Sequence, residues 1–147
     1  MKKSKSIFLS ILVVKLLIAV LFISTFFIPL LSKAYVIISN SPTDISTQVT
    51  IGLYCLELPA IATMIVLHLL LSNIKRGNVF VKKNTSFLTV IFIGLILVGV
   101  ICAFMASISW AFAFTSIAFL FVALILLVLR NVFDYAVEIK SENDFTI

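Results

Sequence analysis

Long apolar runs separated by short polar segments are the main pattern of this chain. The runs occupy residues 7–31, 48–71, 85–110 and 111–130. About 20 apolar residues in a helix cross a hydrocarbon layer of about 30 Å, and a helix pairs its own backbone groups there. The pattern therefore predicts an all-α fold, an integral membrane four-helix bundle made of two helical hairpins. We expect the first run to be retained, since it is longer than the core of a signal peptide.

The fourth run continues into a polar segment that keeps helical spacing. One face carries Phe133, Ala136, Val137 and Lys140. Asp134 and Glu138 fall on another face. The spacing predicts that the last helix extends to about residue 140 on the aqueous side and that residues 141–144 end it.

The polar segment 72–84 separates the two halves of the chain. It contains Gly77, which marks a turn, and it has no acid. In the predicted topology one side of the membrane holds Lys2, Lys3, Lys5, Lys75, Arg76, Lys82, Lys83, Arg130 and Lys140, whereas the other side holds Lys33. Cations accumulate on the cytoplasmic side of membrane proteins. The pattern therefore places both termini and segment 72–84 in the cytoplasm.

Composition supports a single membrane domain spanning residues 1–147. The chain is 63% hydrophobic, whereas soluble domains are roughly 45–50% apolar. Its net charge of +5 comes mainly from cations at helix ends, where they set orientation. We therefore expect contact with membrane lipids and no direct binding of nucleic acid.

Lys15 and Glu57 are the ionisable residues deepest in the apolar runs. A charge at a helix centre costs at least about 2.5–3.5 kcal/mol on insertion scales. The helical rise places Lys15 about 12 Å and Glu57 about 16 Å below the cytoplasmic face of a layer of about 30 Å. We therefore expect a close Lys15–Glu57 contact. Two alternatives remain open: Lys15 reaches back to the cytoplasm while Glu57 is neutral or faces a wet cavity, or both serve an ion pathway.

The remaining residues with chemical potential do not form a recognisable site. His68 shares the helix face of Glu57 and, as the single histidine, fits a capped interfacial side chain better than a metal ligand. Cys55 and Cys102 fall inside apolar runs, which indicates small membrane-buried residues. The sequence has no nucleotide-binding loop, zinc motif or paired catalytic carboxylates. We therefore expect a non-enzymatic protein without metal or cofactor.

Basic and acidic segments meet on the predicted cytoplasmic side. The basic loop can contact anionic lipid headgroups, or it can dock the acidic tail and form a surface for a cytosolic partner. Docking would need apolar anchors beside exposed ion pairs, and Phe80, Phe133, Phe145 and Ile147 are the candidates. The amides of Asn73, Asn78 and Asn84 are able to fix loop or tail backbone. The predicted interaction surface comprises Asn73, Lys75, Arg76, Gly77, Asn78, Phe80, Lys82, Lys83, Asn84, Glu142, Asn143, Asp144, Phe145 and Ile147.

Two short motifs resemble a bacterial family of small four-helix membrane proteins of unknown function. The loop residues Asn73, Ile74, Gly77, Phe80 and Asn84 match a family pattern N-I-x-x-G-x-x-F-x-x-x-N. The ending E-N-D-F-T-I is similar to the family's E-N-D-L-T-V, with apolar replacements at two positions. The resemblance implies a multi-pass protein of the bacterial inner or plasma membrane. It also implies a small helix-turn-helix regulator, often encoded beside the family's members, as a partner.

Three functional hypotheses follow. The first is a membrane-bound regulatory protein whose cytoplasmic loop and tail hold a small helix-turn-helix regulator or another partner. The second is a small-solute or ion transport subunit that uses Lys15, Glu57 and His68 along one water-filled path. The third is an immunity or stress protein against membrane-active peptides, with residues 33–47 as the contact surface.

Overall fold

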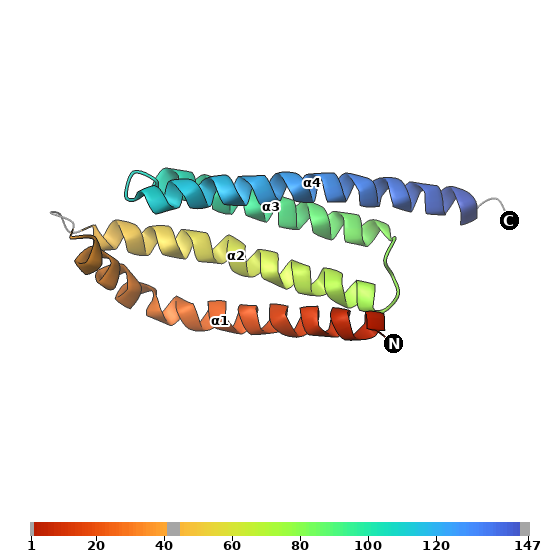
Figure 1. The fold of residues 1–147 in the computed structure, drawn as a ribbon, viewed down its shortest axis with the longest axis horizontal. Helices are drawn as coiled ribbons and strands as arrows, with labels where there is room; N and C mark the ends of the chain where they lie inside the picture. Colours follow the sequence, from red (N-terminus) through yellow and green to blue (C-terminus); the bar gives the residue numbers. More distant parts are fainter. Residues whose placement is uncertain (1, 41–44, 145–147) are drawn as a thin grey trace.

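The chain folds into antiparallel helices arranged as two hairpins (Figure 1). The computed structural model describes residues 2–40 and 45–144, with side chains for residues 5–40 and 45–143. Within these residues the helices are α1 Lys2–Ser39, α2 Ser46–Lys75, α3 Lys82–Met105 and α4 Trp110–Asp144. The predicted all-α four-helix fold is confirmed.

The first connection is shorter than the predicted segment 33–47. Helix α1 continues through the apolar residues 34–38 and ends at Ser39. Asn40 follows with a φ of 52°, a left-handed conformation that asparagine tolerates better than most residues. The helix ends later than predicted because leaving the apolar layer does not break a helix, whereas a turn residue does. Residues 41–44, which were predicted as turn formers, lie outside the described residues.

The ends of α3 and α4 also differ from the prediction. Helix α3 ends at Met105 rather than near Trp110, and Trp110 begins α4. The turn is closed by the Ile108 amide, which donates to the carbonyl oxygen of Met105 at 2.9 Å. Helix α4 stays helical to Asp144, beyond the predicted end near residue 140.

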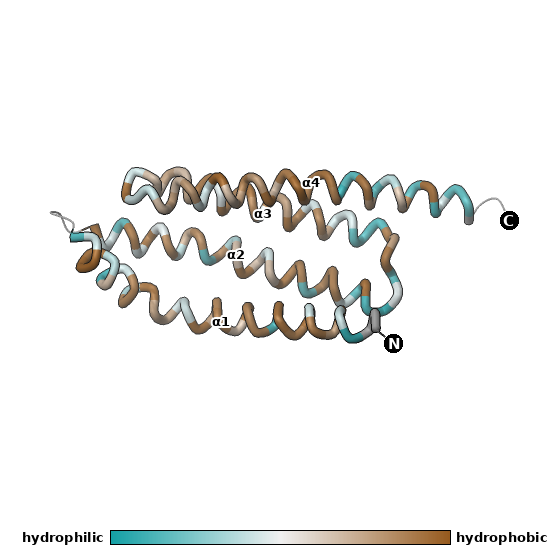
Figure 2. The backbone as a smooth tube through the Cα atoms, in the orientation of Figure 1, coloured by the Kyte–Doolittle hydropathy of each residue, from teal (hydrophilic) through white to brown (hydrophobic). Residues whose placement is uncertain are grey.

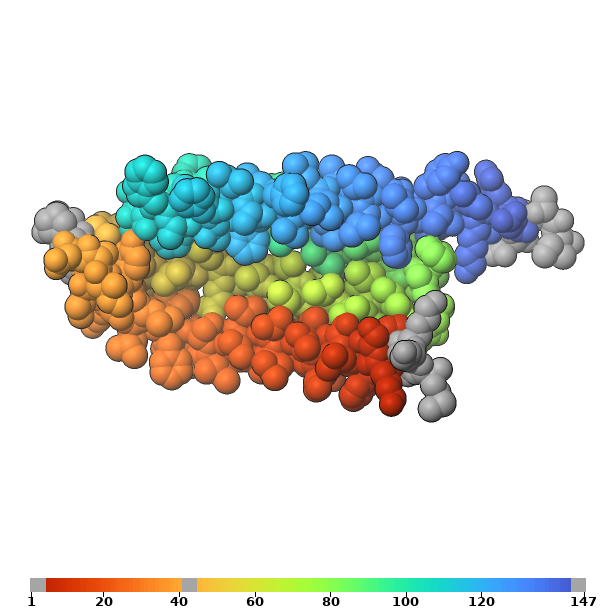
Figure 3. Space-filling view, viewed as in Figure 1, coloured from red at the N-terminus to blue at the C-terminus, as the bar shows by residue number. Residues whose placement is uncertain are grey.

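The helices form an open row rather than a closed bundle. Each packs against its chain neighbours: α1 on α2, α2 on α3 and α3 on α4. Among the described residues α1 and α4 make no comparable contact, so one side of the row stays open. Figure 3 shows α2 lying between α1 and α4 on the viewed face. A core cluster of Leu70, Leu88 and Ile91 joins α2 to α3.

All four helices are long and apolar enough to cross a membrane. Apolar residues dominate most of their length, whereas polar residues gather near the C-terminal end of α4 (Figure 2). Large apolar side chains also cover the outside of the structure. Phe26 on α1 is 85% exposed and Phe104 on α3 is 79% exposed. Such an outer surface is suited to hydrocarbon rather than to water.

Candidate functional site

The loop between α2 and α3 is held in one shape by Asn84. This side chain is 0% exposed. Its Nδ2 donates to the carbonyl oxygens of Asn78 at 2.7 Å and Val79 at 2.8 Å, while its Oδ1 accepts from Nδ2 of Asn73 at 3.1 Å. Gly77 has a φ of 85°, a conformation that L side chains rarely adopt. Of the three amides predicted to fix the loop or tail backbone, Asn84 bonds the loop backbone directly and Asn73 bonds Asn84, whereas Asn78 takes part through its backbone carbonyl.

This loop also contacts α4. The rings of Phe80 and Phe133 lie with their centroids 5.7 Å apart. Phe133 packs in turn against the core cluster between α2 and α3. The contact that the structure shows between the loop and α4 is therefore apolar.

Helix α4 extends past the ends of α1 and α2 (Figure 1). We call this end of the molecule, where α1 begins and α4 ends, the basic end. Val132, Tyr135 and Ile139 are exposed, and their spacing places them on one side of the extension; we call them the α4 stripe. Asp134 and Glu138 lie beside the stripe and are also exposed, so an acidic edge borders an apolar one.

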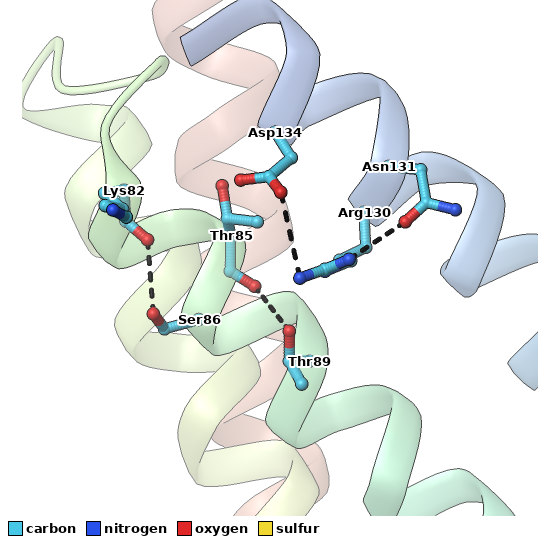
Figure 4. Close-up of polar contacts among 7 residues, drawn as sticks. All are labelled: Lys82, Thr85, Ser86, Thr89, Arg130, Asn131 and Asp134. Atoms are coloured by element: carbon cyan, nitrogen blue, oxygen red, sulfur yellow. Dashed lines mark hydrogen bonds and ion pairs between the residues drawn. The ribbon is translucent and has the colours of Figure 1, made fainter. Parts of the chain in front are cut away.

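Arg130 lies at the base of this extension (Figure 4). Its Nη1 donates to Oδ1 of Asn131 at 3.0 Å, and its Nη2 lies 3.8 Å from Oδ2 of Asp134. The Nε atom of Arg130 and the Oγ1 atom of Thr85 are buried without a hydrogen-bond partner in the described part of the chain. The guanidinium is therefore held by its own helix and borders α3.

The remaining residues of the predicted surface are exposed or fall outside the description. Lys75, Arg76, Lys82 and Lys83 are exposed around the loop. The Nζ atom of Lys75 lies 5.5 Å from the ring centroid of Phe8, and that of Lys83 lies 5.7 Å from the ring of Phe87. Glu142 and Asn143 are exposed in the last turns of α4. Of the terminal motif, Phe145 and Ile147 lie outside the described residues, as does the side chain of Asp144.

Glu57 faces a cavity on the open side of the row. Its carboxylate accepts a hydrogen bond from Oγ of Ser24 at 2.6 Å, and the residue is 8% exposed. The cavity has a volume of about 360 Å³ and is lined by residues of all four helices, including Ile28, Val98 and Phe119. Apart from Glu57, its walls are almost entirely apolar. We call this cavity the Glu57 groove.

Lys15 lies in a different cavity, at the basic end between α1 and α2. This cavity of about 410 Å³ is lined by Ile11, Lys15, His68, Ser72, Lys75 and Arg76, and we call it the basic pocket. His68 was predicted to be a capped interfacial side chain; its Nδ1 atom is buried without a hydrogen-bond partner among the residues described.

The structure does not bring Lys15 and Glu57 together. Ser24, which contacts Glu57, lies nine residues after Lys15, or roughly 13 Å along the helix. The expected contact assumed that each apolar run matches the thickness of the hydrocarbon layer. Both helices are longer than that layer requires, so depths counted from opposite ends do not share a reference. The arrangement agrees with the alternative in which Lys15 turns to the basic end and Glu57 faces a cavity.

Several polar contacts at the α1–α2 seam were not predicted. Besides Ser24, Oγ1 of Thr50 donates to Oγ of Ser32 at 2.6 Å, and the hydroxyl of Tyr54 donates to the carbonyl of Thr25 at 3.4 Å. The sequence does place hydroxyl residues inside the apolar runs, and such residues commonly form hydrogen bonds between membrane helices. Cys102 is buried beside the Glu57 groove, whereas Cys55 is exposed on the surface of α2.

Comparison with curated proteins and with solved structures finds no match. The model of a family described as a protein of unknown function (DUF2975) matches residues 8–147, which is nearly the whole chain. The chain therefore belongs to the DUF2975 family.

Proposed function

We propose that this protein crosses a bacterial cell membrane several times and docks a small helix-turn-helix regulator on its cytoplasmic face. The docking surface consists of the Gly77 loop and the α4 extension. The single observation that carries this proposal is the α4 stripe, an exposed apolar row on a helix that continues beyond its neighbours. A helix that only anchors the protein in the membrane, or only sets its orientation, does not need exposed apolar residues beyond the ends of its neighbours.

The base of the extension is suited to holding a partner in a defined orientation. The Phe80–Phe133 contact ties α4 to the loop, and Asn84 fixes the loop itself. A helix that is ordered before binding loses less conformational entropy when a partner docks. Rigid attachment at the base therefore favours binding through the α4 stripe.

The chemistry of the stripe indicates the class of partner. Apolar residues spaced three and four apart are the anchors used when a helix lies in an apolar groove. Tyr135, with 66% of its surface exposed, is the largest of them. The acidic edge formed by Asp134 and Glu138 complements a basic partner, and DNA-binding regulators are basic.

Recruitment of the regulator to membranes tests the proposal. We expect the double substitution Tyr135→Ser and Ile139→Ser to lower recruitment at least ten-fold, because central aromatic anchors commonly supply more than about 1.4 kcal/mol of binding free energy. Lys140→Ser, an exposed change on another face of the same helix, is the matched control. Deletion of residues 142–147 separately measures the contribution of the terminal motif. Equal recruitment by the double variant and the control would exclude the stripe from the mechanism.

The orientation is tested by labelling. In a background with Cys55→Ser and Cys102→Ser, a cysteine at position 78 is placed in the exposed loop. We expect a membrane-impermeant thiol reagent to label Asn78→Cys in opened cells but not in intact cells. Labelling in intact cells would place the loop outside and contradict a cytoplasmic docking surface.

The Glu57 groove favours a second candidate function, binding or transport of an apolar molecule that carries a cationic group. Its volume falls within the range of small-molecule sites, about 300–1,000 Å³. A carboxylate among apolar walls gives a cation a single preferred position. Glu57→Gln should abolish most binding or flux of a lipophilic amine, whereas Ser24→Ala should retain much of it. Equal behaviour of Glu57→Gln and the unmodified protein would exclude this candidate.

A further inference from the structure

The basic pocket gathers several cations. Lys15, Lys75 and Arg76 line it together with Ser72 and His68, and no acid is among its lining residues. It lies between α1 and α2, on the side of the molecule where the predicted cytoplasmic ends gather. A second cavity, lined by Lys5, Phe8, Leu9 and Lys75, shares Lys75 with it and adds a further cation.

The surroundings of Lys15 favour an anionic ligand here. Lys15 is an exposed residue in the apolar part of α1, and Glu57, the acid expected to neutralise it, is bonded to Ser24 in another cavity. A cation within a membrane helix is costly unless it finds a partner or reaches the interface.

The lining chemistry matches a phosphate group. Ammonium groups bind phosphate as point charges, and a guanidinium adds directed hydrogen bonds. The hydroxyl of Ser72 is a further donor on the pocket wall. Ile11 lines the pocket next to these donors, and Phe8 contacts Lys75. Donors for a headgroup therefore lie next to apolar surface that suits an acyl chain.

We propose that the basic pocket binds the phosphate of an anionic phospholipid from the cytoplasmic leaflet. The position of Lys15 favours a lipid over a free anion. Lys15 of α1 and His68 of α2 line the same pocket. His68 lies seven residues before Lys75, which ends α2, and the helical rise over seven residues is about 10 Å. The pocket therefore extends about 10 Å from the end of α2 toward the membrane interior. A lipid phosphate approaches this depth laterally between the helices, whereas a soluble anion must leave water.

Fluorescence quenching by brominated lipids tests the assignment in the full-length protein. Trp110 lies at the opposite end and is replaced by phenylalanine, and Phe8→Trp introduces a reporter beside Lys75. Brominated phosphatidylglycerol is compared with brominated phosphatidylcholine in vesicles. We expect stronger quenching by phosphatidylglycerol and a loss of this preference of about five-fold in Lys15→Gln, the effect of one cation near a membrane surface. Lys15→Arg should retain the preference.

The controls distinguish binding in the pocket from attraction by the overall positive charge of the protein. They also distinguish binding of a lipid from binding of free phosphate. Lys33→Gln removes an exposed cation at the opposite end and should leave the preference unchanged. Arg76→Gln, at an exposed pocket residue, repeats the test without altering an apolar part of a helix. Equal quenching by both lipids, or an equal loss in Lys33→Gln and Lys15→Gln, would overturn the proposal. Displacement of brominated phosphatidylglycerol by millimolar inorganic phosphate would overturn the assignment to lipid.

Discussion

The two hairpins of this protein are held together by different chemistry. Between α1 and α2, side-chain hydrogen bonds cross the seam, including those from Ser24 to Glu57 and from Thr50 to Ser32. Between α3 and α4, small groups allow close approach, and the one side-chain hydrogen bond across this seam within the described residues joins Ser116 to the backbone carbonyl of Gly99. A Cβ atom added at Gly99 would lie 2.9 Å from a methyl carbon of Leu120, and Ala123 is fully buried.

The difference shows where the molecule is able to accommodate ligands. The backbones of α3 and α4 approach closely at Gly99. Hydrogen bonds at intervals along α1 and α2 fix the alignment of the two helices, and cavities lie next to these bonds. The basic pocket is lined by residues of α1, α2 and the adjoining Arg76, whereas the Glu57 groove is lined by residues of all four helices, with its carboxyl group supplied by α2. We therefore expect structural effects to be largest at the α3–α4 seam and binding effects to concentrate in the first hairpin.

The largest loss of stability is expected for Gly99→Val. The added side chain would collide with Leu120, and the carbonyl of Gly99 also accepts a buried hydrogen bond from Oγ of Ser116 at 2.8 Å. Overpacking of a tight seam costs about 1–3 kcal/mol, and we expect the upper part of that range here. Equilibrium unfolding in mixed detergents would measure it.

A matched control lies one turn further along the same helix. Ala103 is exposed, so Ala103→Val should change stability by less than about 0.5 kcal/mol. This exposure also refines the sequence pattern: Gly99 and Ala103 have the spacing of a packing pair, but only Gly99 lies at the seam. Similar losses for the two variants would contradict the close-packed interpretation of the second hairpin.

The connection between the hairpins should show the next largest effect. Asn84→Ala removes the donor to two loop carbonyls and the acceptor for Asn73. With each net hydrogen bond worth about 0.5–1.5 kcal/mol, we expect a loss of about 2 kcal/mol. Trypsin should then cut faster at the loop cations, which are exposed.

Asn78→Ala is the control for this prediction. Its side chain is exposed, and the loop bond uses its backbone carbonyl, which the substitution keeps. Its cleavage rate should stay close to that of the unmodified protein. Equal acceleration in both variants would mean that Asn84 does not set the shape of the loop.

The helical architecture was accessible from sequence because it depends on a one-dimensional signal. A run of apolar residues as long as the hydrocarbon layer predicts a spanning helix, whatever its neighbours are. Helix ends were less accessible, since α1 continues to Ser39 and α4 to Asp144, beyond the apolar runs. A helix ends at a turn former such as Asn40, and such residues need not coincide with the membrane boundary.

The site residues were only partly accessible for a different reason. Asn84 was identified because an amide in a tight loop has few other roles. The partner of Glu57 was not identified, since it depends on how far one helix is shifted along the other. That shift is set by many weak contacts along the seam, and Ser24 is one of three hydroxyl residues in its neighbourhood on α1. No single residue in the sequence specifies it.

A smaller effect is expected where hydrogen bonds hold the first hairpin. A double-mutant cycle with Ser32→Ala and Thr50→Val measures the coupling free energy between these two hydrogen-bonded residues. Hydrogen bonds between membrane helices average about 0.6 kcal/mol in such cycles, so we expect a coupling free energy of that size. Unfolding in mixed detergents measures all four proteins of the cycle. A coupling above about 2 kcal/mol would mean that α1 is held as tightly as α4 and would remove the contrast between the hairpins.

The smallest effect is expected on the outer surfaces of both hairpins. Phe26 on α1 and Phe104 on α3 are each mostly exposed, although both are large and apolar. In a membrane the exposed ring contacts lipid in the folded state and in the separated helices alike, so its removal changes both states equally. Phe26→Ala and Phe104→Ala should therefore each change the free energy of unfolding by less than about 0.5 kcal/mol. A loss of 2 kcal/mol or more in either variant, measured in the same detergent mixtures, would show that the ring is covered by protein. The affected hairpin would then carry an interface on its outer face, and the contrast between the hairpins would extend beyond their seams.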